Sequence, residues 1–395
     1  MAGKIVITGT GIISAAGRNT EETLKNLCSG RYGIGPVTVL DTRHKEMPVG
    51  EVRLTNEQLH ESAETGTSGE VFSRTTLLGI IAAKEAALMA KVSETPGKRT
   101  GFISATTVGG MCENEKYFTS LLSCESEKKH VESFDIGNSA ELIACQLGIN
   151  HYVTTVNTAC SSSANALALG ARLIRNGLLD RVIAGGTDAL SRFTLNGFHA
   201  LEILDNNHCR PFDRDRKGLN LGEGAAYVVL EPDQSAGRHI CELAGYGNTN
   251  DAYHPTASSP EGKGAFLAMK KALDCAGLKP GDIDYLNAHG TGTQINDLSE
   301  GRAIENLFGN DIPPVSSTKS FTGHTLGASG SIEAVVSILA LKNEIIFPTI
   351  GLVNPMCELS FKAINKLMRS VKIKNVMSNS FGFGGNCTTL IFSEK

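Results

Sequence analysis

The strongest constraint on the fold lies near the middle of the chain, where a β-branched run passes through small residues into a helical run. Residues 152–156 (YVTTV) have the composition of a buried strand, and the Ala/Leu-rich run 164–174 is typical of a helix. The small residues between them allow a tight corner that presents Cys160 at the start of the helix. Free backbone N–H groups and the helix dipole favour a thiolate there. Cys160 is therefore a candidate nucleophile, although an inert buried thiol is the commoner role of a single cysteine.

The same alternation of strand-like and helical runs continues along the chain. It predicts an α/β architecture with largely buried strands. A corner at residues 319–324, before the helical run 331–341, is similar to the corner at Cys160 and indicates an internal duplication. Residues 41–70 are polar and predict an irregular surface excursion, and residues 315–319 predict an extended segment.

Composition limits the class of protein. The chain has 395 residues, of which 20% are charged and 41% hydrophobic, as expected for a globular enzyme. A net charge of −4 gives no reason to expect nucleic acid or a membrane surface as partner. No apolar run approaches the roughly 20 residues that span a bilayer, and no signal peptide precedes the first strand-like run. The ten cysteines form no C-x-x-C pair, which argues against zinc and for reduced thiols. We therefore expect a soluble, cytoplasmic protein.

Three glycine-bracketed loops, each after a strand-like run, carry the other candidate groups. They are HGTGT from His289, KSFTGH ending at His324, and FGFGG from Phe381. A thiolate can accept an acyl group from a thioester, and two imidazoles can hold a carbonyl oxygen on which negative charge develops. The FGFGG loop can offer a backbone N–H beside that of Cys160 as a second oxyanion hole. A papain-like hydrolase needs only one histidine, so the second one favours carbon–carbon bond formation.

These motifs resemble those of the β-ketoacyl-[acyl carrier protein] synthases, the condensing enzymes of fatty acid and polyketide synthesis. The resemblance runs nearly end to end and keeps the family's order. The matching segments are 9–11 (GTG), 158–160 (TAC), 210–213 (RPFD), 222–224 (GEG), 251–254 (DAYH), 287–293 (NAHGTGT), 319–324 (KSFTGH) and 379–385 (NSFGFGG).

The resemblance implies a thiolase-like fold, in which two duplicated βαβαβαββ halves form an α/β/α/β/α sandwich. We expect the halves at residues 1–235, with the cysteine, and 236–395, with the histidines and lysine. The implied activity is decarboxylative Claisen condensation of an acyl-cysteine with malonyl-[acyl carrier protein]. Acyl carrier protein is the implied partner, a homodimer the implied assembly, and no metal or cofactor beyond the carrier's phosphopantetheine arm is implied.

The resemblance also implies roles for individual residues. Cys160 matches the acylated nucleophile, and His289 and His324 match the pair that binds the malonyl thioester oxygen and promotes loss of CO2. The remaining matches are Lys319 and Glu333 as charged residues that order the histidines, Phe383 as an aromatic gate, Thr291 and Thr293 as pantetheine contacts, and Val108 and Phe198 as lining of the acyl pocket.

Two segments depart from the common fatty-acid synthases. Asn165 stands where those enzymes often have a histidine, and residues 191–209 are atypical. Both departures indicate a specialised branch, similar to ketosynthases of aryl polyene or flexirubin-type pigment pathways.

Two alternatives stay open at this point. A degradative thiolase would need a second reactive cysteine near the C-terminus, and Cys387 is available. A chain-length factor shares the fold without catalysing condensation, but such partners usually lose the nucleophile, whereas Cys160 and both histidines are present here.

Overall fold

A computed structural model describes residues 3–66, 70–118, 120, 130, 133, 135–235 and 239–394. Up to the end of β5 at Pro232, the first part of the chain alternates strands with helices. Its elements are β1 (Ile5–Ser14), α1 (Thr20–Ser29), α2 (Asn56–Ala63), α3 (Arg74–Met89), β2 (Thr100–Ala105), α4 (Met111–Tyr117), α5 (Asn138–Gln146), β3 (Tyr152–Val156), α6 (Ser162–Arg175), β4 (Arg181–Asp188), α7 (Arg192–Ala200) and β5 (Gly224–Pro232).

The second part repeats this alternation, with one α-helix between its first two strands where the first part has three. Its elements are β6 (Cys241–Asn250), α8 (Lys263–Ala276), β7 (Tyr285–Asn287), α9 (Gln294–Phe308), β8 (Val315–Ser316), α10 (Lys319–Thr322), the 3₁₀ turn η5 (Leu326–Ala328), α11 (Ser329–Asn343), β9 (Ile345–Ile346), β10 (Met368–Arg369), β11 (Asn375–Phe381) and β12 (Asn386–Ser393).

The strand order reveals the duplication. Within the described residues the main sheet runs β3-β2-β4-β5-β1-β6-β12-β11-β7-β8, so each half reads the same way outward from the centre. In each half the two strands nearest the outer edge are parallel, and the two nearest the centre are antiparallel. Only two residue pairs, Val6 with Glu242 and Ile7 with Cys241, join β1 to β6. The predicted duplicated thiolase-like fold is confirmed, while the boundary at residue 235 stays a prediction.

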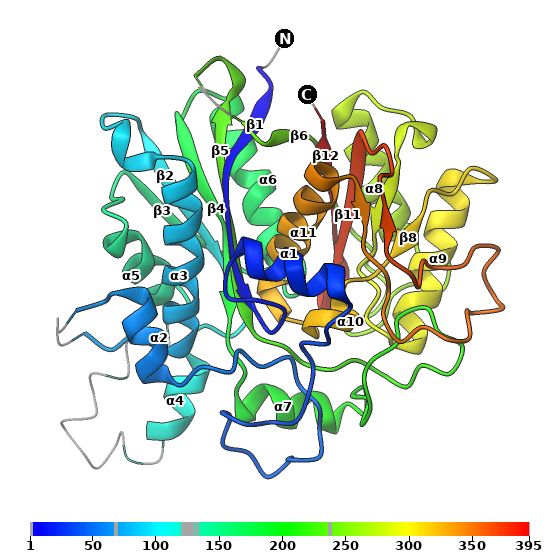
Figure 1. The fold of residues 1–395 in the computed structure, drawn as a ribbon, viewed down its shortest axis with the longest axis horizontal. Coiled ribbons are helices and arrows are strands. Elements are labelled where there is room, and N and C mark those ends of the chain that lie inside the picture. Colours follow the sequence, from blue (N-terminus) through cyan, green and yellow to red (C-terminus); the bar gives the residue numbers. More distant parts are fainter. Residues whose placement is uncertain are drawn as a thin grey trace.

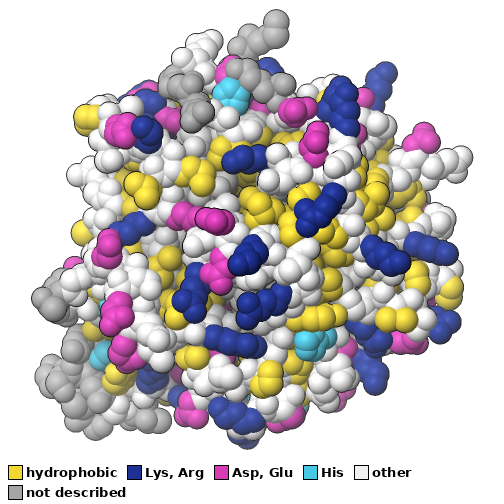
Figure 2. Space-filling view, in the orientation of Figure 1, with side chains coloured by type: hydrophobic (Ala, Val, Ile, Leu, Met, Phe, Trp, Pro, Cys, Tyr) yellow, Lys and Arg dark blue, Asp and Glu magenta, His cyan; other side chains and the backbone are white. Residues whose placement is uncertain are grey.

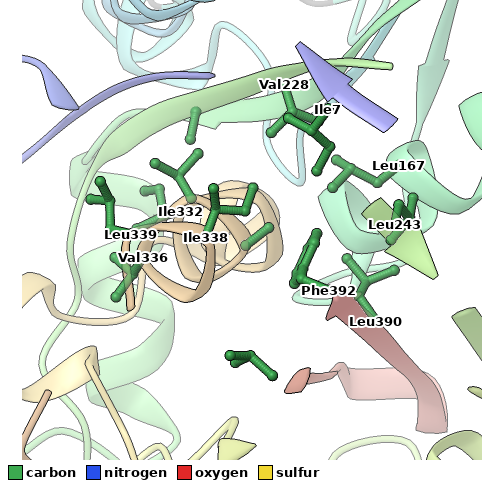
Figure 3. Close-up of a cluster of buried hydrophobic side chains, with 14 of the residues drawn as sticks. Ile7, Leu167, Val228, Leu243, Ile332, Val336, Ile338, Leu339, Leu390 and Phe392 are labelled. Atoms are coloured by element: carbon green, nitrogen blue, oxygen red, sulfur yellow. The ribbon is translucent and has the colours of Figure 1, made fainter. Parts of the chain in front are cut away.

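Helices form the other three layers of the sandwich. In Figure 1, α6 and α11 lie between the two halves of the sheet, α3 covers the outside of the first half and α8 the outside of the second. Figure 3 shows the resulting core, in which Ile332 and Val336 of α11 belong to one buried cluster with Leu167 of α6 and the strand residues Ile7 and Phe392. The helix α11 is buried from Ser329 to Leu341, as expected for a helix that is apolar on all sides.

A close approach of the two central helices positions the cysteine corner. A Cβ on Gly330 of α11 would lie 2.7 Å from the backbone nitrogen of Ala164 in α6. Only glycine fits at this distance, so α11 packs directly against the first turn of α6. Ser331 strengthens the contact, because its backbone N–H donates to Ser163 Oγ at 2.8 Å. The cysteine corner is thereby fixed to the helix that follows the His324 loop.

Three local predictions from sequence are wrong. The strand β3 is half-buried rather than buried, because it lies at the edge of the sheet. The segment 41–70 contains helix α2, which begins with a capping box between Thr55 and Gln58. Lys319 begins the short helix α10 instead of ending an extended segment.

Among the described residues no helix has both the length and the apolar character needed to cross a bilayer, and no cluster of His, Cys, Asp and Glu has metal-ligand geometry. Figure 2 shows Lys and Arg side chains gathered across the middle of one face, among hydrophobic ones, despite the negative net charge.

Candidate active site

The corner at Cys160 is strained and tightly hydrogen-bonded. Ala159 has a φ of 54°, a left-handed conformation that is uncommon for alanine and is maintained by its surroundings. The Ser162 N–H donates to Ala159 O at 3.0 Å, and the Thr158 N–H donates to Ser162 Oγ at 2.8 Å. These contacts turn the chain from β3 into α6 and leave Cys160 at the corner with only 6% of its surface exposed.

Burial controls the acidity of this thiol. It raises the pKa of Cys160 to about 11, although the charge of Lys319 and a hydrogen bond from the backbone of Phe383 both lower it. The sequence predicted that the helix start would favour a thiolate. The structure corrects this, because desolvation outweighs those stabilising contacts and the resting site holds a thiol.

His289 follows β7, and its ring orientation is fixed by a lysine. Lys319 Nζ donates to His289 Nδ1 at 3.1 Å and to the His289 carbonyl oxygen at 2.7 Å, and it also pairs with Glu333. An ammonium group has no acceptor, so Nδ1 of His289 must be the acceptor. The ring proton therefore lies on Nε2.

His324 has the same tautomer, but a different donor binds its Nδ1 atom. The backbone N–H of Leu326 donates to His324 Nδ1 at 3.2 Å, and Ser329 Oγ lies 2.9 Å from the same nitrogen. A backbone N–H can only donate, so Nδ1 accepts and Nε2 again carries the proton. Leu326 adopts a φ of 51° to make this bond, another strained residue beside the site.

Both imidazoles are neutral. Burial is the largest cause that lowers the pKa of His289 and of His324 well below 6.5, and the charge of Lys319 lowers both further. The two rings lie edge to face with centroids 5.4 Å apart. The site therefore offers two uncharged N–H donors from neighbouring rings.

One cavity of about 360 Å³ joins these groups, since Cys160, His289 and His324 all line it. The predicted gate Phe383 also lines it, and its ring stacks on that of Phe198 with centroids 6.0 Å apart.

The other predicted binding residues lie at or beside this cavity. Thr291 and Thr293 line it and their hydroxyls lie 2.8 Å apart. Val108 is not among the lining residues and packs in the apolar cluster that also contains Phe198. Cys387 lines the cavity as well, so two thiols face one space.

Two buried carboxylates near the site were not identified from sequence. Glu300 of α9 accepts the backbone N–H groups of His289 and Gly290 at 2.9 and 2.8 Å, and burial raises its pKa to about 7. Asp188 ends β4 and accepts bonds from the loop after β2 and from η5. The available signal for Asp188 was an acidic residue at the end of the otherwise largely apolar run 182–188 (VIAGGTD).

The departure at Asn165 also has a structural role. Its Nδ2 donates to Thr158 Oγ1 and to Asn386 Oδ1, both at 2.9 Å. Its Oδ1 accepts from Asn248 Nδ2 at 2.9 Å and from Thr388 Oγ1 at 3.0 Å. An amide network therefore connects the helix behind the cysteine to β6 and β12.

A buried thiol that shares a cavity with two neutral imidazole donors, on a duplicated five-layer α/β fold, is typical of a thiolase-like condensing enzyme. Family models agree, because the β-ketoacyl synthase N-terminal domain matches residues 2–236 and the C-terminal domain matches residues 240–353. The chain belongs to the β-ketoacyl synthase family, whose enzymes are condensing acyltransferases.

Individual relatives cover the whole chain. The 3-oxoacyl-[acyl-carrier-protein] synthase 2 of Staphylococcus aureus (strain COL) is 36% identical over 99% of this chain and 98% of its own. The ishigamide ketosynthase/chain length factor structure superposes with a TM-score of 0.92 at 30% identity, covering 100% of both chains. A type II polyketide ketosynthase in complex with its acyl-carrier protein, AntDE:AntF, has a TM-score of 0.86 at 25% identity, again over 100% of both chains.

Proposed function

We propose that this protein is a 3-oxoacyl-[acyl carrier protein] synthase, which joins an acyl group on Cys160 to the carbanion released from a malonyl thioester. The observation that carries the proposal is that Cys160 shares a cavity with His289 and His324, each of which holds its proton on Nε2. A hydrolase needs an imidazole that accepts a proton from water or thiol. Here the Nδ1 atoms are occupied and the Nε2 atoms donate, which suits an oxyanion rather than water activation.

In the first step the Sγ of Cys160 attacks the carbonyl carbon of an acyl thioester on the carrier. The backbone N–H groups of Cys160 and Phe383 are close enough to the sulfur to lower its pKa, and they would stabilise the oxyanion. The bond between the acyl carbon and the pantetheine sulfur breaks. The pantetheine leaves as a thiol with the proton from Cys160.

In the second step the two Nε2–H groups bind the thioester oxygen of malonyl-carrier. The bond between the α carbon and the carboxylate breaks and CO2 leaves. The electron pair of that bond stays on the substrate as an enolate, which His289 and His324 stabilise. The α carbon then attacks the acyl carbonyl, the bond from that carbon to the Cys160 sulfur breaks, and the departing thiolate takes a proton from water. The 3-oxoacyl product stays on the carrier, and neither step needs a metal or another cofactor.

The residues around Cys160 and the two histidines would orient the catalytic groups and bind the substrate. Lys319, neutralised by Glu333, fixes His289, and the hydroxyls of Thr291 and Thr293 are placed to contact the pantetheine arm. The stacked rings of Phe383 and Phe198 form a gate, and the acyl chain would extend past them into the adjoining apolar cluster that contains Val108.

The test is acylation followed by mass spectrometry. Wild-type protein incubated with acyl-carrier gains the acyl mass, and Cys160→Ala does not. The matched control is Cys145→Ala, which removes an exposed thiol and acylates normally. His289→Ala and His324→Ala acylate but release little CO2 from malonyl-carrier. An acylated Cys160→Ala protein, or unchanged CO2 release in both histidine variants, would contradict the proposal.

We propose that acyl carrier protein delivers both substrates and that a second copy of the chain binds along β3. The complex with carrier among the similar structures supports the first point. In the described part of the chain β3 pairs only with β2, and an exposed edge strand offers unpaired backbone groups to a symmetric partner. Sedimentation of purified protein at micromolar concentration tests this, and a monomer would instead favour a related subunit such as a chain length factor.

The pathway is proposed to be a specialised one of the aryl polyene or flexirubin type. The amide network at Asn165 and the likeness to a ketosynthase/chain length factor support this choice. A cytoplasmic location fits the free thiols among the described cysteines. Acylation measured with a panel of carriers bearing saturated and polyunsaturated chains tests the branch, and a preference for saturated chains would contradict it.

A further inference from the structure

Asp188 is a fully buried carboxylate whose two oxygens together accept hydrogen bonds from two different segments. Its Oδ1 accepts the Thr106 hydroxyl at 2.5 Å and the Val108 N–H at 3.3 Å, both from the loop after β2. Its Oδ2 accepts the Thr107 N–H at 2.9 Å and the Gly327 N–H at 2.7 Å. A single carboxylate therefore joins the loop after β2 to η5, which follows His324.

The first of these segments contacts the cysteine corner. Thr107 Oγ1 donates to the carbonyl oxygen of Ala159 at 3.4 Å. Ala159 is the strained residue immediately before the nucleophile. Asp188 fixes that loop by accepting the N–H groups of Thr107 and Val108. The loop in turn fixes the peptide between Ala159 and Cys160, on which the position of the nucleophile depends.

The second segment contains the peptide that sets the tautomer of His324. Gly327 follows Leu326, whose N–H donates to His324 Nδ1. The fit is tight, because a Cβ on Gly327 would lie 2.8 Å from Asp188 Oδ2 and 2.8 Å from the Thr107 backbone nitrogen. Asp188 therefore anchors η5 one residue away from the donor that keeps the proton on Nε2.

We propose that Asp188 is the positioning residue of this site, holding the Cys160 corner and the His324 turn in one mutual geometry. It touches neither substrate nor reacting atoms, and it acts through Thr107 and Gly327. Its effect on turnover rests on the proposed condensation, whereas its effect on Cys160 itself does not.

The charge of Asp188 gives the proposal a second consequence. Burial is the main cause that raises the pKa of Cys160, the charge of Asp188 raises it further, and the charge of Lys319 lowers it. The other titratable groups that line the cavity with the thiol are the neutral His289 and His324 together with Glu202, Lys217, Asp251, His254 and Cys387. Removing the carboxylate charge should therefore lower the pKa of the Cys160 thiol.

Three variants separate geometry from charge. Asp188→Asn keeps the shape but offers one acceptor oxygen where two are used, and it removes the charge. Gly327→Ala forces the contact apart and leaves the charge in place. Asp180→Asn is the matched control, because Asp180 precedes the other end of β4 and its side chain is 40% exposed beside Arg99.

Two assays apply to all three variants. The first is CO2 release from malonyl-carrier, with kcat and KM resolved. The second is the pH dependence of Cys160 alkylation by iodoacetamide, located by peptide mass spectrometry, which needs no acyl substrate. If wild type alkylates normally but releases no CO2, the proposed function fails while the alkylation comparison still tests Asp188.

We expect Asp188→Asn and Gly327→Ala each to lower kcat on the order of 10²-fold with KM nearly unchanged, as for a misplaced catalytic group. Asp188→Asn should also move the alkylation midpoint to lower pH, while Gly327→Ala and Asp180→Asn leave it in place. The proposal is overturned if folded Asp188→Asn keeps kcat within twofold of wild type, or if its midpoint does not fall. If Asp188→Asn does not fold, Gly327→Ala decides, and a wild-type kcat in that variant overturns the proposal.

Discussion

The substitution Lys319→Met separates the structural role of the lysine from its role in catalysis. Lys319 is 1% exposed, and its ammonium group serves His289 Nδ1, the His289 carbonyl and Glu333 together. Methionine fills a similar volume without a donor. The variant leaves a buried carboxylate without its cation and a ring nitrogen without its donor.

The two losses have different magnitudes. Breaking a buried ion pair costs about 3–5 kcal/mol, and we take the lower end because the pKa of Glu333 is already raised to about 7, so the carboxyl can take up a proton. For 395 residues the unfolding entropy is about 0.8 kcal/mol/K, so about 3 kcal/mol lowers Tm by about 4 °C. Without Lys319 the proton of His289 can move to Nδ1. The loss of one oxyanion donor then lowers decarboxylation about 10²–10³-fold.

The pH dependence of the stability loss has a definite sign. Lys319 lowers the pKa of Glu333, so its removal raises that pKa further. When the pKa of a carboxyl is higher in the folded than in the unfolded protein, the free energy of unfolding falls as pH rises between the two pKa values. The Tm deficit of Lys319→Met should therefore be larger at pH 8 than at pH 6.

The assay compares Lys319→Met with the double variant Lys319→Met/Glu333→Gln by calorimetry and CO2 release. Removing both charges should recover the stability to within about 1 kcal/mol but leave decarboxylation low, because His289 still lacks its donor. Lys98→Met is the control, since Lys98 pairs with Glu231 outside the cavity. Recovery of CO2 release in the double variant would refute the argument that Lys319 sets the tautomer.

Three further outcomes follow from the cavity. Cys387→Ser should keep condensation within about threefold of wild type, because Cys387 only lines the cavity, and a loss above 10²-fold would instead support the thiolase alternative. CO2 release should stay flat from pH 8 to 6.5, since the pKa values of His289 and His324 lie well below 6.5, and a fall centred at 6.5 would contradict their neutral state. Phe198→Ala removes the ring stacked on Phe383 and should raise kcat/KM for long acyl chains relative to short ones by about 10-fold, as measured with a carrier series.

The sequence predicted the fold class and selected three side chains that the structure places in one cavity, because strand ends in an α/β fold converge and glycine-rich loops after them are easy to recognise. It failed where long-range packing decides. The run 152–156 is as β-branched as a central strand, and only the strand order shows that β3 is an edge. Helix α2 had a readable signal, the Thr55–Gln58 capping box, within a segment that looked irregular.

The sequence indicated which residues form the site, but not their pKa values or the positions of their protons. The corner at Cys160 predicted an acidic thiol, but the extent of burial is a property of the packed molecule and it reverses the expected shift. The proton positions on the two histidines depend on Lys319 and on the Leu326 N–H, contacts that no spacing rule gives. The positioning role of Asp188 could not be predicted for the same reason, since its hydrogen-bond partners come from two loops distant in sequence.

The two histidines obtain the same tautomer from unlike donors, and the difference has a physical reason. Two ammonium groups in one buried site would add an uncompensated charge, which costs several kcal/mol in a low-dielectric interior. Lys319 is balanced by Glu333, and a neutral peptide N–H serves His324 instead. In the proposed reaction the enolate charge meets two neutral dipoles already oriented toward it, so no uncompensated charge has to be buried before the substrate arrives. The strained backbone at Leu326 is the structural cost of using a peptide N–H, rather than a second lysine, as the donor to His324.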